Sequence, residues 1–192
     1  MNTLTSILEL SYEELKIRKL QVKNEKKNGK TREQFREEMV EALGNEPGIK
    51  AIMVAFCDLE GKLHLIDYDK EFALNSIDNL TFDGSSVSGF AILNKSDLRL
   101  VPDWSSMRWL PSDVFGQGKV VVFANVHDQD NQPFTSDFRV QLATMTDSLQ
   151  SQGITVNAAP EIEGFLFEGV DVEQFYHEDE GFETVTEGGY YN

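Results

Sequence analysis

The chain of 192 residues is long enough for one ordinary domain, or for a small domain with part of another. It carries 33 Asp and Glu against 17 Lys and Arg, a formal net charge of −16 that repels phosphate backbones and anionic lipid headgroups. Nucleic acid and membrane surfaces are therefore excluded as main partners. The single cysteine excludes an intrachain disulfide and a cysteine-rich zinc site. With no signal-peptide pattern and no apolar run near the roughly 20 residues of a membrane helix, we expect a cytoplasmic globular protein.

The negative charge is concentrated after residue 50. Residues 1–50 carry ten Lys and Arg against nine Asp and Glu, whereas residues 160–192 carry ten acids and no Lys or Arg. Such an acidic stretch is typical of a solvated tail, but its carboxylates can also serve to bind cations. Composition leaves both interpretations open.

Two amphipathic helices are predicted in a helical arm over residues 1–48. The first spans residues 4–26, with an apolar stripe formed by Leu4, Leu8, Tyr12 and Leu15. The second begins with a capping box at Thr31, has Phe35, Met39 and Leu43 on one face, and is stopped by Gly44.

A small sheet domain is predicted over residues 49–130. The apolar run 51–57, a tight turn at Glu60-Gly61 and the run 63–66 indicate a β-hairpin. Short strands and loops are expected over 67–118, and residues 119–126 form a further strand.

A helix and a strand are predicted in residues 131–192. Phe138, Leu142, Met145 and Leu149 are spaced as one face of a helix that Ser136 opens and Gly153 closes. A strand is expected from Ile154 to Phe167. One helix and one strand cannot cover both faces of a sheet, so this segment reads as the unfinished start of something larger. The predicted fold class is α+β: a helical arm, a small mixed sheet and this incomplete helix–strand unit.

Glu161 and Glu163 are the first candidate site. Side chains two apart in a strand share a face, so both carboxylates are expected on one side, with Ile162 and Leu166 on the other. Paired carboxylates suit a hard divalent ion such as Mg²⁺ or Mn²⁺. Taken alone, the pattern is more common on a strand whose Glu residues face solvent.

The second candidate is the loop Phe82–Phe90, in which glycine and serine surround Asp83. Its free amides and hydroxyls can bind a ligand, and its carboxylate can attract a cation or take a proton. Composition alone favours a turn in which Asp83 caps its own backbone. The third candidate, Gly188–Tyr191, is either a binding loop or a frayed end.

Together these segments resemble the N-terminal part of a bacterial-type glutamine synthetase. The loop Phe82–Phe90 resembles that family's Phe-Asp-Gly-Ser-Ser-x-x-Gly-Phe almost letter for letter. The resemblance covers about residues 49–192, in the same order as in the family. The other matching segments are Val54–Gly61, Lys95–Asp103, Pro160–Phe167 and Gly188–Tyr191.

The resemblance implies a ligase that uses ATP to form γ-glutamyl phosphate from glutamate, which ammonia then attacks. It implies that Glu161 holds the metal nearer the nucleotide and Glu163 the metal nearer glutamate, Mg²⁺ or Mn²⁺. Asp83, Ser86 and Tyr190 would form the ammonium pocket, with Asp83 as the catalytic base. In this family the N-terminal domain is a β-grasp sheet, so the resemblance implies a β-grasp domain over residues 49–130 and a truncated start of the catalytic domain over residues 131–192. The family's Asp loop, here at Asp83, reaches a neighbouring subunit's site, so a homo-oligomer ring is expected.

Two departures from the family pattern are visible. Gly164 stands where the family usually has Phe, and the downstream metal ligands, nucleotide-binding segment and glutamate-binding arginines are absent. The chain is therefore expected to be inactive by itself. Two alternatives stay open: a fragment of a γ-glutamyl-polyamine ligase, which Asp83 disfavours, and a stand-alone non-catalytic module that docks on a synthetase ring.

Overall fold

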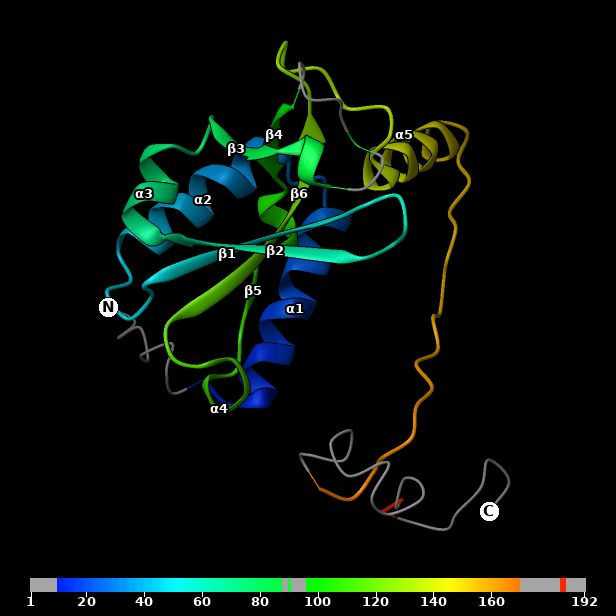
Figure 1. The fold of residues 1–192 in the computed structure, drawn as a ribbon. Helices are drawn as coiled ribbons and strands as arrows, with labels where there is room; N and C mark the ends of the chain where they lie inside the picture. The colour runs from blue at the N-terminus through cyan, green and yellow to red at the C-terminus, as the bar shows by residue number, and fades with distance from the viewer. Residues whose placement is uncertain (1–9, 88–89, 91–95, 170–183, 186–192) are drawn as a thin grey trace. The chain divides into compact units, whose positions relative to one another are not determined.

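The computed structural model describes residues 10–87, 90, 96–169 and 184–185. They fall into two units, one ending at Ile154 and the other beginning at Thr155, and each is described by itself. The first unit combines helices with a six-stranded sheet, so the predicted α+β class is confirmed (Figure 1). Within the described part of the chain, no helix is long and apolar enough to cross a membrane.

Both helices of the predicted arm are present. α1 (Tyr12–Lys27) begins after Ser11, whose side chain forms a capping box with Glu14; residues 4–9 of the predicted helix lie outside the described residues. α2 (Arg32–Gly44) begins with the predicted capping box of Thr31 and Gln34. Each cap satisfies amides that the first turn of a helix leaves unpaired, which explains where both helices start.

The sheet has the strand order β2-β1-β6-β4-β3, and β5 pairs with β6 outside this path. β1 and β6 are parallel, and all the other pairs are antiparallel. The predicted hairpin and the predicted strand at 119–126 are confirmed. The strands are β1 (Ala51–Cys57), β2 (Leu63–Asp69), β3 (Leu80–Asp83), β4 (Asp97–Pro102), β5 (Arg108–Trp109) and β6 (Lys119–His127).

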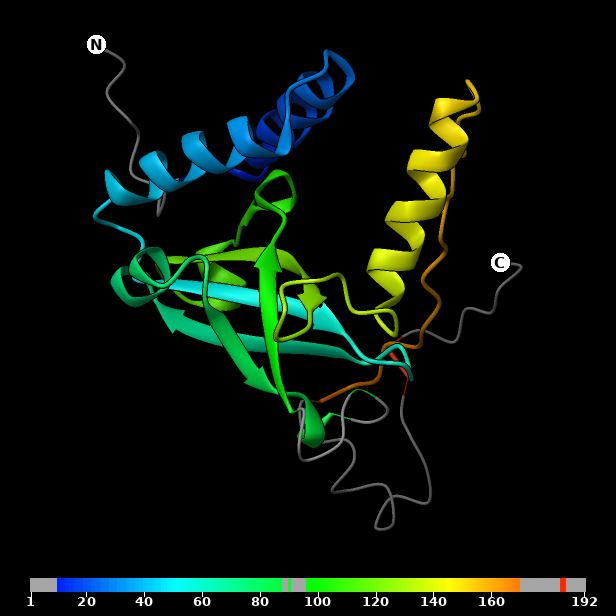
Figure 2. The same cartoon turned by 90° about the horizontal axis from the view of Figure 1, so that it is seen from above.

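The core lies between one face of the sheet and the helices that cover it. Strict alternation along β6 buries every second side chain from Val120 to Val126. Figure 2 shows α1 and α2 on one side of the sheet, and α2 contributes Phe35 and Leu43, both at most 1% exposed. Short helices α3 (Lys70–Asn75) and α4 (Ser112–Phe115) join the strands.

α5 (Phe138–Ser151) forms where the third helix is predicted, but Asp137 rather than Ser136 is its N-cap residue. The predicted apolar stripe is not buried in the described structure: Phe138, Leu142 and Met145 are 49–67% exposed. The spacing of these residues thus predicted the helix correctly, but no described residues cover the apolar face that they form.

The strand predicted over residues 154–167 does not form in the second unit. Residues 154–166 pair with no described strand, and only an isolated bridge joins Phe167 to Thr184. Ile162 is 99% exposed and Leu166 is 78% exposed. A strand needs neighbours for its backbone groups and for its apolar face, and beside the bridge at Phe167 the described residues supply only the Val185 amide, which donates to the Leu166 carbonyl at 3.0 Å.

Gly118, just before β6, lies where its backbone approaches the backbone of Gly48 closely. Its φ is +74°, and a Cβ there would lie 2.5 Å from the Gly48 carbonyl oxygen. We expect Gly118→Ala to lower the free energy of unfolding by about 2 kcal/mol or more, since strained backbone and overpacking each cost about 1 kcal/mol. Gly29 has a φ of +86°, and a Cβ there would have no neighbouring atom within 4 Å, so Gly29→Ala is the matched control. Equal losses in urea titrations would contradict the role of the close contact.

Candidate functional site

Asp83 ends β3 and is held by the turn that follows. One carboxylate oxygen accepts hydrogen bonds from the amide of Ser85 at 2.9 Å and from its hydroxyl at 2.6 Å. The other oxygen accepts from the hydroxyl of Ser86 at 2.9 Å. Asp83 therefore caps its own turn, the 3-10 helix Gly84–Ser86, and this contact brings Asp83 and Ser86 together.

The Asp83 carboxylate is exposed and anionic. Hydrogen bonds from the Ser85 and Ser86 hydroxyls hold its pKa below the ordinary value for aspartate, because they stabilise the charged form. At neutral pH the group is ionised and one side of it faces solvent. An exposed carboxylate whose hydrogen-bond donors are already fixed can attract a small cation or accept a proton from one.

A cluster of aromatic side chains packs together at the two ends of this loop. Phe82 and Phe56 have ring centroids 4.5 Å apart, and Phe90 lies 6.2 Å from each. Phe90 also contacts Phe134 and is only 5% exposed, so it anchors the loop that follows Asp83. The backbone of Gly84 donates to the Ser96 carbonyl at 2.7 Å, which joins the two ends of the loop.

A buried acid fixes the neighbouring hairpin turn. Asp58 is 3% exposed; one of its carboxylate oxygens accepts from the amides of Glu60 and Lys62, and the other lies 2.7 Å from His64 Nε2. The His64 contact, with these amide bonds, lowers the pKa of Asp58. His64 stacks on Phe56, so the pair supports the aromatic cluster. All of these hydrogen bonds lie within the hairpin, which agrees with a structural role for Asp58 and His64.

The other predicted site residues lie in the second unit or outside the described residues. Glu161 and Glu163 are exposed in a segment without regular structure. Tyr190 lies outside the described residues. Among the described side chains, no three His, Cys, Asp or Glu gather in a way that would hold a metal ion. The structure thus brings Asp83 and Ser86 together but does not place either relative to the two glutamates.

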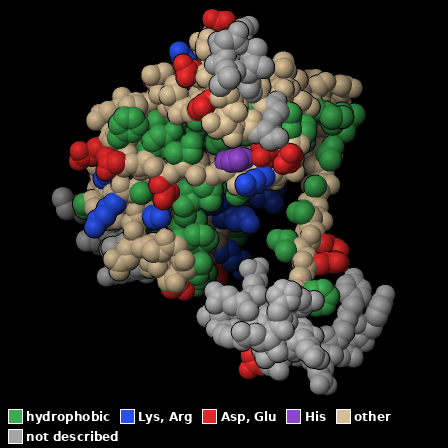
Figure 3. All heavy atoms as spheres, in the orientation of Figure 1, with side chains coloured by type: hydrophobic (Ala, Val, Ile, Leu, Met, Phe, Trp, Pro, Cys, Tyr) green, Lys and Arg blue, Asp and Glu red, His purple; other side chains and the backbone are tan. Residues whose placement is uncertain are grey.

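Hydrophobic side chains are also exposed beside the sheet. Leu63, Leu65 and Phe72 are each about half exposed, and Figure 3 shows hydrophobic side chains spread over this face. Tyr68 and Phe72 stack with centroids 6.0 Å apart. These residues come from β2 and α3, and nothing in their arrangement forms a catalytic group.

Comparison with known proteins identifies the fold and then the family. The curled mixed sheet with a helix across it is a β-grasp domain: residues 48–129 match the family described as "Glutamine synthetase, beta-Grasp domain". Residues 48–129 therefore belong to this domain family, and the resemblance found in the sequence is confirmed for this part of the chain.

The sequence match to curated relatives covers more of the chain than residues 48–129. The chain is 32% identical over 130 residues to the glutamine synthetase of Thermotoga maritima, covering 67% of this chain and 30% of the relative. It is 34% identical over 142 residues to that of Archaeoglobus fulgidus, covering 70% and 28%. The chain thus spans about 30% of the length of these relatives.

A solved structure supports the fold independently. The cryo-EM structure of Plasmodium falciparum glutamine synthetase aligns with a TM-score of 0.55 at 17% identity, covering 62% of this chain and 23% of that one. At this identity the likeness concerns the fold alone.

Proposed function

We propose that the chain is the N-terminal portion of a glutamine synthetase, which ligates ammonia to glutamate with ATP through γ-glutamyl phosphate. The observation that carries the proposal is the Asp83 turn, an exposed and ionised carboxylate within the segment that matches the family. Ammonium is a small cation that must lose a proton before its nitrogen can attack, and a carboxylate serves both needs.

In this proposal Asp83 attracts ammonium and accepts its proton, and Ser86 keeps the carboxylate oriented. The Ser86 hydroxyl donates to Asp83 at 2.9 Å, so it fixes the direction of the remaining lone pairs. Tyr190 completes the ammonium pocket by its motif. A bulky amine would have to displace this compact turn, which favours ammonia over a polyamine as the acceptor.

Glu161 and Glu163 would hold Mg²⁺ or Mn²⁺. Their oxygen donors fit a hard divalent ion, but two carboxylates supply only part of a six-oxygen shell. The remaining ligands would come from water, from substrate phosphate and from the further parts of a complete enzyme. When bound, the metal would neutralise phosphoryl oxygens of ATP and of the acyl phosphate.

The isolated chain is expected to form no glutamine, and activity would require a homo-oligomer ring in which the Asp83 loop completes a neighbour's site. Cytoplasmic ATP and glutamate would be the co-substrates. The alternative of a non-catalytic module that docks on such a ring shares the fold, and it predicts that Asp83 has no chemical role.

A chimera separates these possibilities. Residues 48–129 of this chain replace the matching domain of the Thermotoga maritima enzyme, and glutamine formation is measured against ammonium concentration. We expect the chimera to be active and Asp83→Asn to lower its turnover by about 100-fold or more, the usual contribution of a general base. Asp128 accepts hydrogen bonds from the amides of its own turn in a similar way, so Asp128→Asn is the matched control and should retain activity.

An assembled chimera in which Asp83→Asn keeps both its turnover and its affinity for ammonium would contradict the proposed role of the loop. An assembled chimera without any activity would contradict the ligase assignment of the domain itself. Assembly is checked by light scattering, so that misfolding is not mistaken for loss of chemistry.

A further inference from the structure

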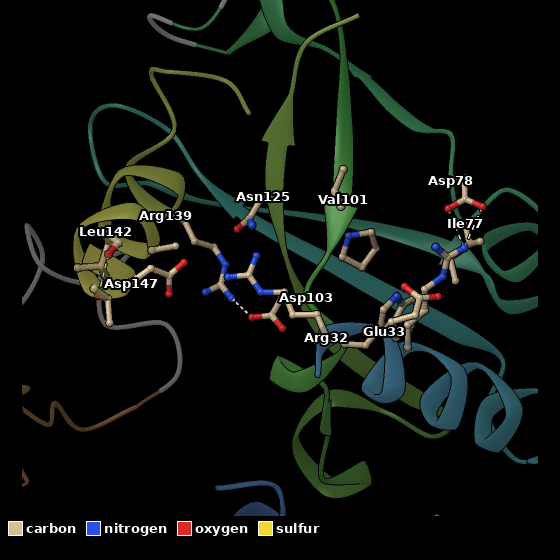
Figure 4. A pocket seen from close by; sticks show the side chains of 15 residues that line it. Arg32, Glu33, Ile77, Asp78, Val101, Asp103, Asn125, Arg139, Leu142 and Asp147 are labelled. Atoms are coloured by element: carbon tan, nitrogen blue, oxygen red, sulfur yellow. Dashed lines mark hydrogen bonds and ion pairs between the residues drawn. The ribbon is translucent and has the colours of Figure 1, made fainter. Parts of the chain in front are cut away.

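A pocket of about 420 Å³ opens between the start of α2 and the part of α5 from Arg139 to Asp147, on a floor made by β4 and β6 (Figure 4). The walls carry charges of both signs. α2 supplies Arg32, and α5 supplies Arg139 and Asp147. All of these residues lie in the first unit, and the volume is within the usual range for a small-molecule site.

Some of these charges are already paired and others are free. Arg139 forms an ion pair with Asp103, and Arg36 pairs with Asp78 at 2.7 Å. Arg32 and Asp147 have no hydrogen bond or ion pair with any described residue. In Figure 4 the Arg32 side chain reaches from α2 toward Arg139, and Asp147 points from α5 toward the same place. Glu33 of α2 also lines the pocket and has no hydrogen bond or ion pair with any described residue, so the pocket offers one free cation and two free anions to a ligand.

Two polar atoms in the same pocket lack partners. Within the described part of the chain, Asn125 Oδ1 and Arg139 Nε are the buried side-chain nitrogen and oxygen atoms without a hydrogen bond. Both residues line this pocket. One atom is an acceptor and the other is a donor, and buried polar groups are normally satisfied. The missing partners would thus have to include both an N–H donor and an anionic or carbonyl oxygen.

An arginine stands in the first turn of each helix that borders the pocket. α5 carries Arg139 there and no acidic residue within the turn, although its N-cap residue is Asp137. α2 begins with Arg32, which Glu33 follows in the same turn. Burial lowers the pKa of nearby Lys26, and Arg139 and Arg32 are among the cations that lower it further. Arg32 and Arg139 thus place two cations on the wall of the pocket, beside the carboxylates of Glu33 and Asp103, in a protein of net charge −16.

We propose that this pocket binds a free α-amino acid as a zwitterion. Its carboxylate would pair with Arg32 and Arg139, and its ammonium group with Asp147 and the amide oxygen of Asn125. The apolar edge formed by Trp104 and Leu142 would contact the side chain of the ligand. A simple anion would leave Asp147 and Asn125 unpaired, and a simple cation would leave Arg32 and Arg139 Nε unpaired. The inference does not rest on the ligase activity.

The test is calorimetry on the full 192-residue chain with glycine, L-alanine, L-serine, L-glutamine and L-glutamate as probes. Propionate and ethylamine serve as partial analogues of L-alanine, because each lacks one of its two charges. We expect at least one amino acid to bind at millimolar concentration or below and to raise the thermal midpoint, since a ligand of the folded state stabilises it. Both partial analogues should bind about tenfold more weakly or worse, the usual loss with one charged hydrogen bond.

Arg32→Gln and Asp147→Asn test the two ends of the ligand. Both side chains are exposed and unpaired in the described structure, so neither change should disturb folding. Each should weaken binding about tenfold. Lys119→Gln, at an exposed ion pair with Asp67 outside the pocket, is the control and should bind as the wild type does. Absence of binding by every probe, equal binding of propionate and L-alanine, or unchanged binding by both pocket variants would each overturn the proposal.

Discussion

Replacing Phe35 with Ala is expected to lower the free energy of unfolding by about 3–5 kcal/mol, the usual cost of emptying a buried aromatic site. The Phe35 side chain is 1% exposed and lies in the core shared by α2 and the sheet. Domains of this size are stable by only about 5–15 kcal/mol, so the variant should be close to its unfolding threshold. Urea titration followed by circular dichroism measures the loss.

Phe72→Ala is the matched control. Phe72 is 55% exposed and its ring contacts Tyr68 on the surface of α3, so the same change should cost about 1 kcal/mol or less. Similar small losses at both positions would mean that α2 is a detachable arm. A large loss at Phe35 alone would mean that α2 unfolds together with the sheet.

The sequence was informative where one local signal decides the structure. The capping box at Thr31 specifies the start of α2, and the alternation from Val120 to Val126 specifies β6. The glycine and serine around Asp83 favoured a turn in which Asp83 caps its own backbone, and this turn forms. Each of these depends on residues within a few positions of one another, so no knowledge of the tertiary structure is needed.

Features that depend on distant partners could not be derived in the same way. The strand expected at 154–167 needs neighbours that the described residues do not supply, so its alternation alone did not specify it. The strand order puts β6 between β1 and β4, although β1 ends at Cys57 and β6 begins only at Lys119. No pattern in the loops and short strands between them indicates that these two strands pair.

The pocket between α2 and α5 was missed for the same reason. Arg32 and Arg139 are far apart in the sequence, and only the folded sheet brings their helices together. A local signal was present in α5, whose first turn holds Arg139 and no acidic residue, whereas the first turn of α2 holds Glu33 beside Arg32. Breaks in a local rule of this kind are expected at functional sites.

Asp137 joins α5 to the sheet, and the variant Asp137→Ala should show how much this connection stabilises the fold. It is 2% exposed; one carboxylate oxygen accepts from the Val126 amide at 2.7 Å and the other from the Arg139 amide at 2.8 Å. Loss of the helix cap costs about 1 kcal/mol. The buried Val126 amide would also lose its partner, which adds about 1–3 kcal/mol. We therefore expect the free energy of unfolding to fall by about 2–4 kcal/mol.

Asp69→Ala separates the two contributions. Asp69 caps α3 through the Phe72 amide at 3.0 Å but is exposed and binds no strand amide, so its loss should cost about 1 kcal/mol. The excess at Asp137 then measures the bond to β6, and hydrogen exchange of the Val126 amide should accelerate in the Asp137 variant alone. Equal losses at the two caps, with Val126 still protected, would show that α5 is not held to the sheet through Asp137. In that case the position of Arg139 in the pocket would depend on its ion pair with Asp103 instead.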